Sequence, residues 1–458
     1  IGAVYGGANQ ANIGTQNSSS DITLTINSGM VANVFGGNNT SGTVYGDITV
    51  NIDKTTDSDD CGWYVGNVFG GGNNAAYPGD PEVNIKNGDV SLNVFGGGKG
   101  QGATVTGNPV VTIGASGKTV TIAGNVYGGG DAAPVDGNTL VTIDHGSTIG
   151  TKVFGGGNQA GVTGNATVLL TSGIIGNTTV QDVYGGIYGG CNSSGTIGGN
   201  SSITVLGGTV GTDSKHANIH GGGYGQLTGV SGNVTVNIGQ SGSTAGATIY
   251  GDIYGGSALG TVNTDHSGGG TYNKTAVNLY GGTIDGNVYG GGLGDENVAA
   301  IVYGDVDVLL DGAALVAKYS ENLPSSGMIF GCNNVNGTPK GHVKVIVYKT
   351  TGIDGIQERS TAANRATTTE SDHTYELSAV FGGGNHAAYV PDDLDNGYAE
   401  VFINGCDDVS INSVYGGGNA ASTPATDVIV QGAYEIEYVF GGGNGAGTSN
   451  PGANVGYY

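Results

Sequence analysis

The sequence predicts an all-β fold, a parallel β-helix (β-solenoid), from two observations. A short phrase recurs along the whole chain: a β-branched residue, then Tyr or Phe, then glycines and often Asn. Between the phrases, apolar and polar residues alternate, as in segment 234–238, Val-Thr-Val-Asn-Ile. Such alternation is typical of a half-buried strand. The repeat predicts stacked rungs of roughly 25–35 residues, with a few loop insertions.

The aromatic residue of the phrase occupies one slot in each repeat, and seven of the eight Phe residues stand in it. Equivalent side chains of neighbouring rungs meet in a β-helix, so this slot predicts a structural aromatic ladder. Where the aromatic is missing, the phrase at Ile219 has His220 in its place. The predicted ladder consists of Tyr5, Phe35, Phe69, Phe95, Tyr127, Phe154, Tyr184, Tyr254, Tyr289, Phe330, Phe381, Tyr415 and Phe440.

The slot after the glycines predicts a second ladder, made of amides that hydrogen bond along the axis. Asp131 and Lys99 also occur in this slot. The glycines themselves suit a tight corner, by allowing positive φ or a close approach of backbones. The alternative is a backbone nest that holds anions or sugar hydroxyls. The predicted Asn ladder consists of Asn73, Asn158, Asn385, Asn419 and Asn444.

Each rung is expected to contain two or three short strands joined by Gly, Asn and Asp turns. No helix is expected, because glycine every few residues destabilises a helix by about 1 kcal/mol each. Outward-facing threonines suggest a column that could resemble an ice-binding face, but Asn84, Asp307, Lys344 and Ile429 interrupt it. That column comprises Thr23, Thr49, Thr112, Thr142, Thr204 and Thr235.

A sandwich or a propeller fits less well, because a propeller blade needs four strands in about 40–45 residues and these repeats are mostly shorter. We expect one elongated domain over residues 1–458, with an irregular region at 311–379 that carries inserted loops. Smaller insertions are expected at 53–64, 239–247 and 392–396. Insertions on solenoids often carry recognition, although a merely solvated loop is an equal alternative.

The composition excludes several classes of partner. The chain has 37 acidic and 13 basic residues and a formal charge of −24, which disfavours nucleic acid and anionic lipid. No stretch approaches 18 apolar residues, so no membrane span is expected. The four cysteines lie far apart without a CxxC pair, which indicates neither a disulfide framework nor a zinc site. The chain begins and ends within the repeat, which leads us to expect a processed product or a segment of a longer protein.

The sequence contains no recognisable catalytic or metal-binding motif. Gly117-Lys118-Thr119 lacks the glycine that a phosphate loop needs five positions earlier, and the histidines are scattered. A polysaccharide-cleaving β-helix needs carboxylates on adjacent rungs, whereas the Asp59-Asp60 and Asp407-Asp408 pairs lie in expected turns. We expect no enzyme, no catalytic or cofactor-binding residue and no cofactor. At most, the acidic loop 392–397 would bind Ca²⁺ weakly.

Segments such as 164–186 and 281–292 resemble the Gly-rich repeats of large bacterial surface proteins, including adhesins and autotransporter passengers. The resemblance implies an extracellular or cell-surface location. We therefore expect a non-enzymatic structural or adhesive surface protein. Its partners would be a surface or glycan ligand, or other copies of itself in a filament joined through exposed terminal rungs. The alternative is a polysaccharide-binding or polysaccharide-cleaving β-helix.

Overall fold

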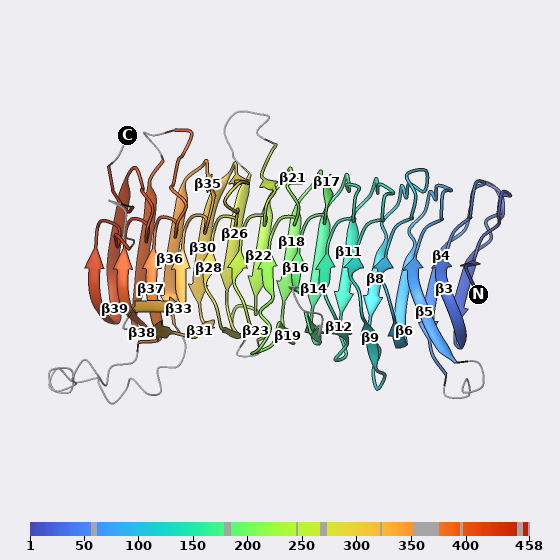
Figure 1. Cartoon of the computed structure of the whole chain (residues 1–458), viewed down its shortest axis with the longest axis horizontal. Coiled ribbons are helices and arrows are strands. Elements are labelled where there is room, and N and C mark those ends of the chain that lie inside the picture. Colours follow the sequence, from blue (N-terminus) through green and yellow to red (C-terminus); the bar gives the residue numbers. More distant parts are fainter. Residues whose placement is uncertain are drawn as a thin grey trace.

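The computed structural model describes residues 1–55, 62–177, 185–243, 246–265, 273–320, 323–350, 375–393, 397–446 and 452–456. Every regular element in these ranges is a β-strand, and nearly all strands pair in parallel. The coils follow one another along a single axis from the N-terminus to the C-terminus (Figure 1). The predicted parallel β-helix is therefore confirmed.

A complete coil has four sides. The coil that starts at Gly186 shows them in order as the aromatic side, the bridge side, the long-strand side and the short-strand side. They are formed by β16 (Gly186–Tyr188), β17 (Ser194–Ile197), β18 (Ser201–Val205) and β19 (Thr209–Val210). The expectation of two or three strands per rung was too low for this coil. The bridge side escapes sequence analysis because in earlier coils it is only a row of isolated bridges, including Tyr77 to Val105.

The same sides recur in the other coils. The long-strand side contains β2 (Ile22–Ile26), β4 (Ile48–Asp53), β6 (Glu82–Val90), β8 (Val110–Ile113), β11 (Thr139–Ile143), β14 (Ala166–Leu170), β22 (Val234–Ile238), β26 (Lys274–Leu279), β30 (Asp305–Asp311) and β36 (Val343–Lys349). The aromatic side contains β1 (Val4–Tyr5), β3 (Gly29–Phe35), β5 (Trp63–Phe69), β7 (Val94–Phe95), β10 (Val126–Tyr127), β13 (Lys152–Phe154), β20 (Asn218–His220), β24 (Ile253–Tyr254), β28 (Val288–Tyr289), β34 (Met328–Phe330) and β37 (Leu377–Phe381).

The two remaining sides are shorter. The short-strand side contains β9 (Val120–Ile122), β12 (Thr148–Ile149), β15 (Ile174–Ile175), β23 (Thr248–Ile249), β27 (Thr283–Ile284) and β31 (Ala314–Leu315). The bridge side continues in β21 (Leu227–Val230), β25 (Thr261–Val262), β29 (Ala300–Val302) and β35 (Gly337–Pro339). The last two long strands, β38 (Ala399–Tyr415) and β39 (Thr426–Phe440), turn the corner and reach the aromatic side.

The core follows from the period of two along each strand. In β22, Val234, Val236 and Ile238 are buried, while the residues between them face outward and are only partly buried. Val236 lies opposite Ile203 of the preceding coil and Val277 of the next, so like meets like along the axis. These columns form one continuous apolar core that runs from coil to coil. Hydrophobic burial in every coil therefore orders a chain that is unusually rich in glycine.

The irregular region near residue 320 contains an antiparallel hairpin of β32 (Lys318–Ser320) and β33 (Leu323–Ser326), after which the coil resumes at β34. Most of the stretch 350–376 that was expected to form a loop lies outside the described residues, as do parts of the three smaller expected insertions. Cys61 is also outside them, whereas Cys191, Cys332 and Cys406 are free thiols. The described part of the chain contains no helix with the length and hydrophobicity needed to cross a membrane.

Candidate functional site

The aromatic side carries one unbroken stack of rings. Successive ring centroids lie between 4.6 and 5.1 Å apart, with planes inclined by 18° or less. The stack runs through Tyr5, Phe35, Phe69, Phe95, Tyr127, Phe154, Tyr188, His220, Tyr254, Tyr289, Phe330, Phe381, Tyr415 and Phe440. Both faces of each interior ring are covered, so the ladder stabilises the rod and offers no ring face to a ligand along its length.

One predicted member of the ladder is corrected. Tyr184 lies outside the described residues, and Tyr188 stacks between Phe154 and His220 in the place assigned to it. Both tyrosines precede a pair of glycines, so the phrase alone does not distinguish them. The distance to the next amide does, because Asn192 stands four residues after Tyr188, as Asn158 does after Phe154.

The Asn ladder lies four residues after the aromatic in the coils that have Asn there, and all five predicted members take part in it. Its slot holds other residues at Lys99, Asp131, Tyr224, Ala258 and Leu293. Each amide nitrogen donates to the side-chain oxygen of the preceding coil, for example from Asn419 to Asn385 and from Asn444 to Asn419, both at 2.8 Å. The sequence analysis missed Asn39 and Asn192, which donate in the same way, and Asn9 and Asn334, which accept from the amide of the next coil. A fixed offset from the aromatic would have identified them.

Two further amide columns were also missed. One lies two residues before the aromatic, where the Asn67 amide donates to Asn33 at 3.1 Å and the Asn125 backbone N–H donates to the Asn93 side chain at 2.8 Å. The other lies in the turn before the long strand. Its oxygens accept the backbone N–H of the equivalent residue in the next coil, and its members include Asp80, Asn108, Asn138, Asn165, Asn200 and Asn233. These hydrogen bonds satisfy backbone N–H groups of the turns, which have no partner in the strand pairing.

The tyrosine hydroxyls of the ladder join these columns. Tyr127 accepts amide hydrogens from Asn125 at 3.0 Å and Asn192 at 3.3 Å. Burial raises the pKa of Tyr127 to about 12, against the opposing effect of these two hydrogen bonds. Tyr254 donates to Asp252 at 3.0 Å and accepts from Asn334 at 2.9 Å. The hydroxyls are thus engaged inside the rod wall.

The glycine after each aromatic is explained by close approach of backbones. A Cβ on Gly155 would lie 2.5 Å from the carbonyl oxygen of Gly189 in the next coil, and one on Gly6 would lie 2.6 Å from that of Gly36. Of the two expected reasons for these glycines, close approach of backbones is confirmed here, whereas positive φ does not apply, because neither glycine has one. The second glycine donates its N–H to a carbonyl oxygen of the next coil, as from Gly37 to Gly71, so this N–H is not available to an anion.

The predicted threonine column is in fact two columns. Thr23 and Thr49 lie opposite each other in one, while Thr112 and Thr142 lie opposite each other in the other. Thr235 belongs with the first pair and Thr204 with the second. Toward the C-terminus the first column becomes charged, with Lys344 paired to Glu400 at 2.7 Å. Neither column is a uniform threonine face.

His220 is the polar member of the ladder. It is 1% exposed, stacks 4.9 Å from Tyr188 and 4.6 Å from Tyr254, and its Nδ1 has no hydrogen-bond partner among the described residues. Burial lowers its pKa from 6.5 to about 3, because the charged imidazolium is disfavoured there. The ring is therefore neutral at physiological pH and acts as an aromatic.

His220 should make the rod acid-sensitive. Because its pKa is lower in the folded state, unfolded chain binds the proton first. The free energy of unfolding should therefore fall by about 1.4 kcal/mol per pH unit as pH drops below 6.5, until about pH 3. The His220→Phe variant should lose this component. Urea unfolding of both proteins between pH 7 and 4 measures the difference. A variant with the exposed His386 substituted should show the same fall in stability as wild type. A difference between wild type and His220→Phe that does not change with pH would contradict this role of His220.

Carboxylates gather where β36, β37, β38 and β39 come together. The Thr350 hydroxyl donates to Glu376 at 2.5 Å, and the Ser410 hydroxyl donates to Glu435 at 2.7 Å. Burial raises the pKa of Glu376, and the negative charges of Glu435 and Asp408 raise it further. The described residues contain no group of three His, Cys, Asp or Glu side chains arranged to hold a metal.

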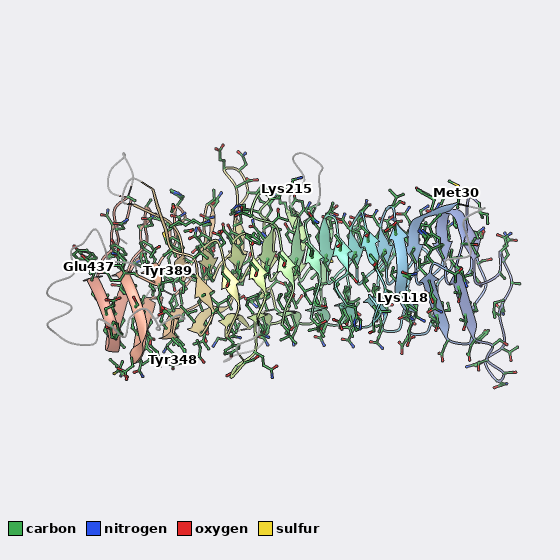
Figure 2. The ribbon with its side chains drawn as sticks, turned by 90° about the horizontal axis from the view of Figure 1, so that it is seen from below. Met30, Lys118, Lys215, Tyr348, Tyr389 and Glu437 are labelled. Carbon is green, nitrogen blue, oxygen red and sulfur yellow. The ribbon has the colours of Figure 1, made fainter. Side chains whose placement is uncertain are left out.

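The other acidic pairs are only partly described. Asp59-Asp60 lies outside the described residues. Asp407-Asp408 lies within strand β38, so the expectation of a turn is wrong for this pair, and Asp408 pairs with Lys349 at 3.8 Å. In the loop expected to bind Ca²⁺ weakly, residues 394–396 are not described, and Asp392 pairs with Lys340 at 3.1 Å. Basic residues are dispersed, as Lys118 and Lys215 at separate turns illustrate (Figure 2).

A groove of about 700 Å³ lies on the outer surface at the corner between the long-strand and short-strand sides. One wall carries Tyr280, Asp311 and Lys349, which lie at the ends of the long strands of three consecutive coils: Tyr280 follows β26, Asp311 ends β30 and Lys349 ends β36. The other carries Thr248 and Thr283, which are register partners. Glycine backbone at 281, 282 and 312 also lines the groove. Tyr348, which precedes Lys349, is exposed and lies in the C-terminal part of the rod (Figure 2).

The groove lies next to the insertion expected at 239–247, of which residues 242, 243, 246 and 247 contribute to its lining. In an earlier coil the same corner is filled by local polar contacts, since the Ser172 hydroxyl donates to Asp144 at 2.9 Å. Among the described residues, the side chains of Thr248, Tyr280 and Thr283, which line the groove, make no such contact, and the corner is hollow there.

Comparison with known proteins identifies no relative. No family model matches the sequence, and neither a curated protein nor a solved structure shows significant similarity to it.

Proposed function

We propose that this chain is a non-enzymatic extracellular protein of a bacterial surface, structural or adhesive, whose working part is the rod. The observation that carries the proposal is the continuity of the aromatic ladder from Tyr5 to Phe440, backed by the core that runs beside it. A fold that places most of its residues in a stiff stack presents surface over a long distance. That property suits a spacer or adhesive rod.

End-to-end stacking of copies is part of this proposal. In the coil of β39, Val439 and Phe440 are 49% and 44% exposed, whereas Val380 and Phe381 two coils earlier are buried. A Cβ on Gly441 would meet nothing within 4 Å. This coil thus keeps the residues that suit a following coil, and the first coil of another copy offers the matching partner, Tyr5.

The register of such a contact follows from the repeat. Tyr5 of a second copy would stack on Phe440 as Phe440 stacks on Tyr415, with centroids 5.0 Å apart. The Asn9 amide of that copy would donate to Asn444, continuing the direction of donation seen along the Asn ladder. The open N–H and C=O groups of both coils would pair as in strand addition.

The purified chain should therefore form fibres at high concentration, with a strong axial repeat of about 4.8 Å. Gly441→Val should abolish fibres without unfolding the rod, because its side chain enters the space of the incoming coil. Leu92→Ala, which removes an exposed apolar side chain from the flank, should leave fibres intact. Electron microscopy and light scattering measure both. Monomers at high concentration, or fibres that persist in Gly441→Val, would contradict end-to-end assembly.

A polysaccharide-binding or polysaccharide-cleaving β-helix is the second candidate, and the groove at Tyr280 favours its binding form. For the cleaving form, the carboxylates Glu376 and Glu435 are the ones to test. Release of reducing ends from glycans, abolished by Glu376→Gln, would support an enzyme and overturn the non-enzymatic proposal.

A further inference from the structure

We propose that the groove at the corner beside residues 239–247 binds a neutral oligosaccharide, with Tyr280 as the stacking platform and Asp311, Thr248 and Thr283 as hydrogen-bonding groups. This inference rests on the proposed extracellular adhesive role, for which it names a ligand class.

Four polar side chains of the groove are uncommitted. Within the described ranges, the side chains of Thr248, Tyr280, Thr283 and Asp311 make no hydrogen bond. Elsewhere on the rod, side chains at comparable corners and turns bond to one another from coil to coil, as Ser172 bonds to Asp144. A row of free hydroxyl and carboxylate groups on one concave surface suits a ligand that both donates and accepts hydrogen bonds, as sugar hydroxyls do.

The shape of the groove favours a linear ligand. Thr248, Thr283 and Ala314 are register partners on three consecutive coils, so the wall repeats every ~4.8 Å along the axis. A Cβ on Gly312 would lie 2.8 Å from the carbonyl oxygen of Tyr280, so side chains are kept off the lining there by backbone packing. A sugar ring can therefore approach the backbone and place its C–H face against the half-buried Tyr280 ring.

The charge of the groove selects against acidic glycans. It contains one carboxylate, Asp311, and one ammonium, Lys349, and Lys349 is already 3.8 Å from Asp408. The chain as a whole carries a formal charge of −24. Repulsion of a polyanion would therefore outweigh attraction to one lysine, and neutral sugars remain as the fitting class.

Calorimetric titration of the full chain with neutral cello-, xylo-, malto- and manno-oligosaccharides tests the proposal, with an oligogalacturonide as the acidic probe. At least one neutral series should bind, and the acidic probe should not. Tyr280→Ala should weaken binding by about tenfold or more. Ala314→Trp should block the groove without removing any of the proposed contacts, which separates loss of the site from loss of stability. Tyr45→Ala, which truncates an exposed tyrosine far from the groove, should bind as wild type.

The inference is overturned if no neutral oligosaccharide binds, if only the acidic probe binds, or if binding survives in both Tyr280→Ala and Ala314→Trp. Failure of the two proposals can be told apart. Fibre formation without groove-dependent binding would support the structural role and contradict only the proposed ligand. Cleavage of the bound sugar would instead contradict the non-enzymatic function and support the groove as a sugar-binding site.

Discussion

Replacing Phe154 by Ala should lower the free energy of unfolding by about 3–5 kcal/mol. The ring is 0% exposed and is held between Tyr127 at 5.1 Å and Tyr188 at 5.0 Å. Truncation removes the burial of the ring and both stacking contacts, and it leaves a cavity that neighbouring rings cannot fill because the strands fix their spacing. Urea unfolding measures the change, and loss of amide-exchange protection at Val126 and Val153 locates it.

Phe440→Ala is the matched control. This ring occupies the same slot but is 44% exposed and has one ladder neighbour, Tyr415. Its loss should lower the free energy of unfolding by only about 1 kcal/mol. Equal effects at Phe154 and Phe440 would mean that stacking between coils does not determine the contribution of the ladder.

Gly155→Ala should lower the free energy of unfolding by about 3 kcal/mol or more. The new Cβ would lie 2.5 Å from the carbonyl oxygen of Gly189 and 3.2 Å from the Cβ of Ala166. Gly189 is itself held to the following coil, because its N–H donates to the carbonyl oxygen of His220 at 2.9 Å, so it cannot move aside without separating the strands. Thermal and urea unfolding measure the loss.

Gly441→Ala provides the comparison, because Gly441 occupies the same slot in the coil of β39 and its Cβ would meet nothing within 4 Å. Its free energy of unfolding should match wild type within about 0.5 kcal/mol. If Gly155→Ala were as harmless as Gly441→Ala, the close contact between successive coils would not exist in solution.

The fold was predictable because one residue type marks each coil. The aromatic slot sets the rung length, and alternation as in 234–238 sets which residues face the core. Register was harder to predict. Thr49 and Thr112 both lie in alternating segments, but short triplets do not reveal which residues are opposite each other, so two columns were read as one. The same ambiguity between two Tyr-Gly-Gly phrases led to Tyr184 instead of Tyr188.

The candidate site was predictable only as a location. The longer turn at 239–247 indicated that the coil departs from its period there, and the groove lies beside it. The groups on its walls could not be found in the same way. Tyr280 and Asp311 are single residues that follow β26 and end β30, and their proximity arises from the stacking of coils. The cluster at Glu376 is similar, because Glu435 comes from a later coil.

An experimental density map of the rod tests most directly whether equivalent residues of successive coils meet. It should place the rings of Tyr127 and Phe154 parallel, with centroids about 5 Å apart, and Thr112 opposite Thr142 in adjacent parallel strands. A map with those two rings in unrelated places, or with Thr112 shifted by one residue against Thr142 so that the core residues point outward, would contradict the account.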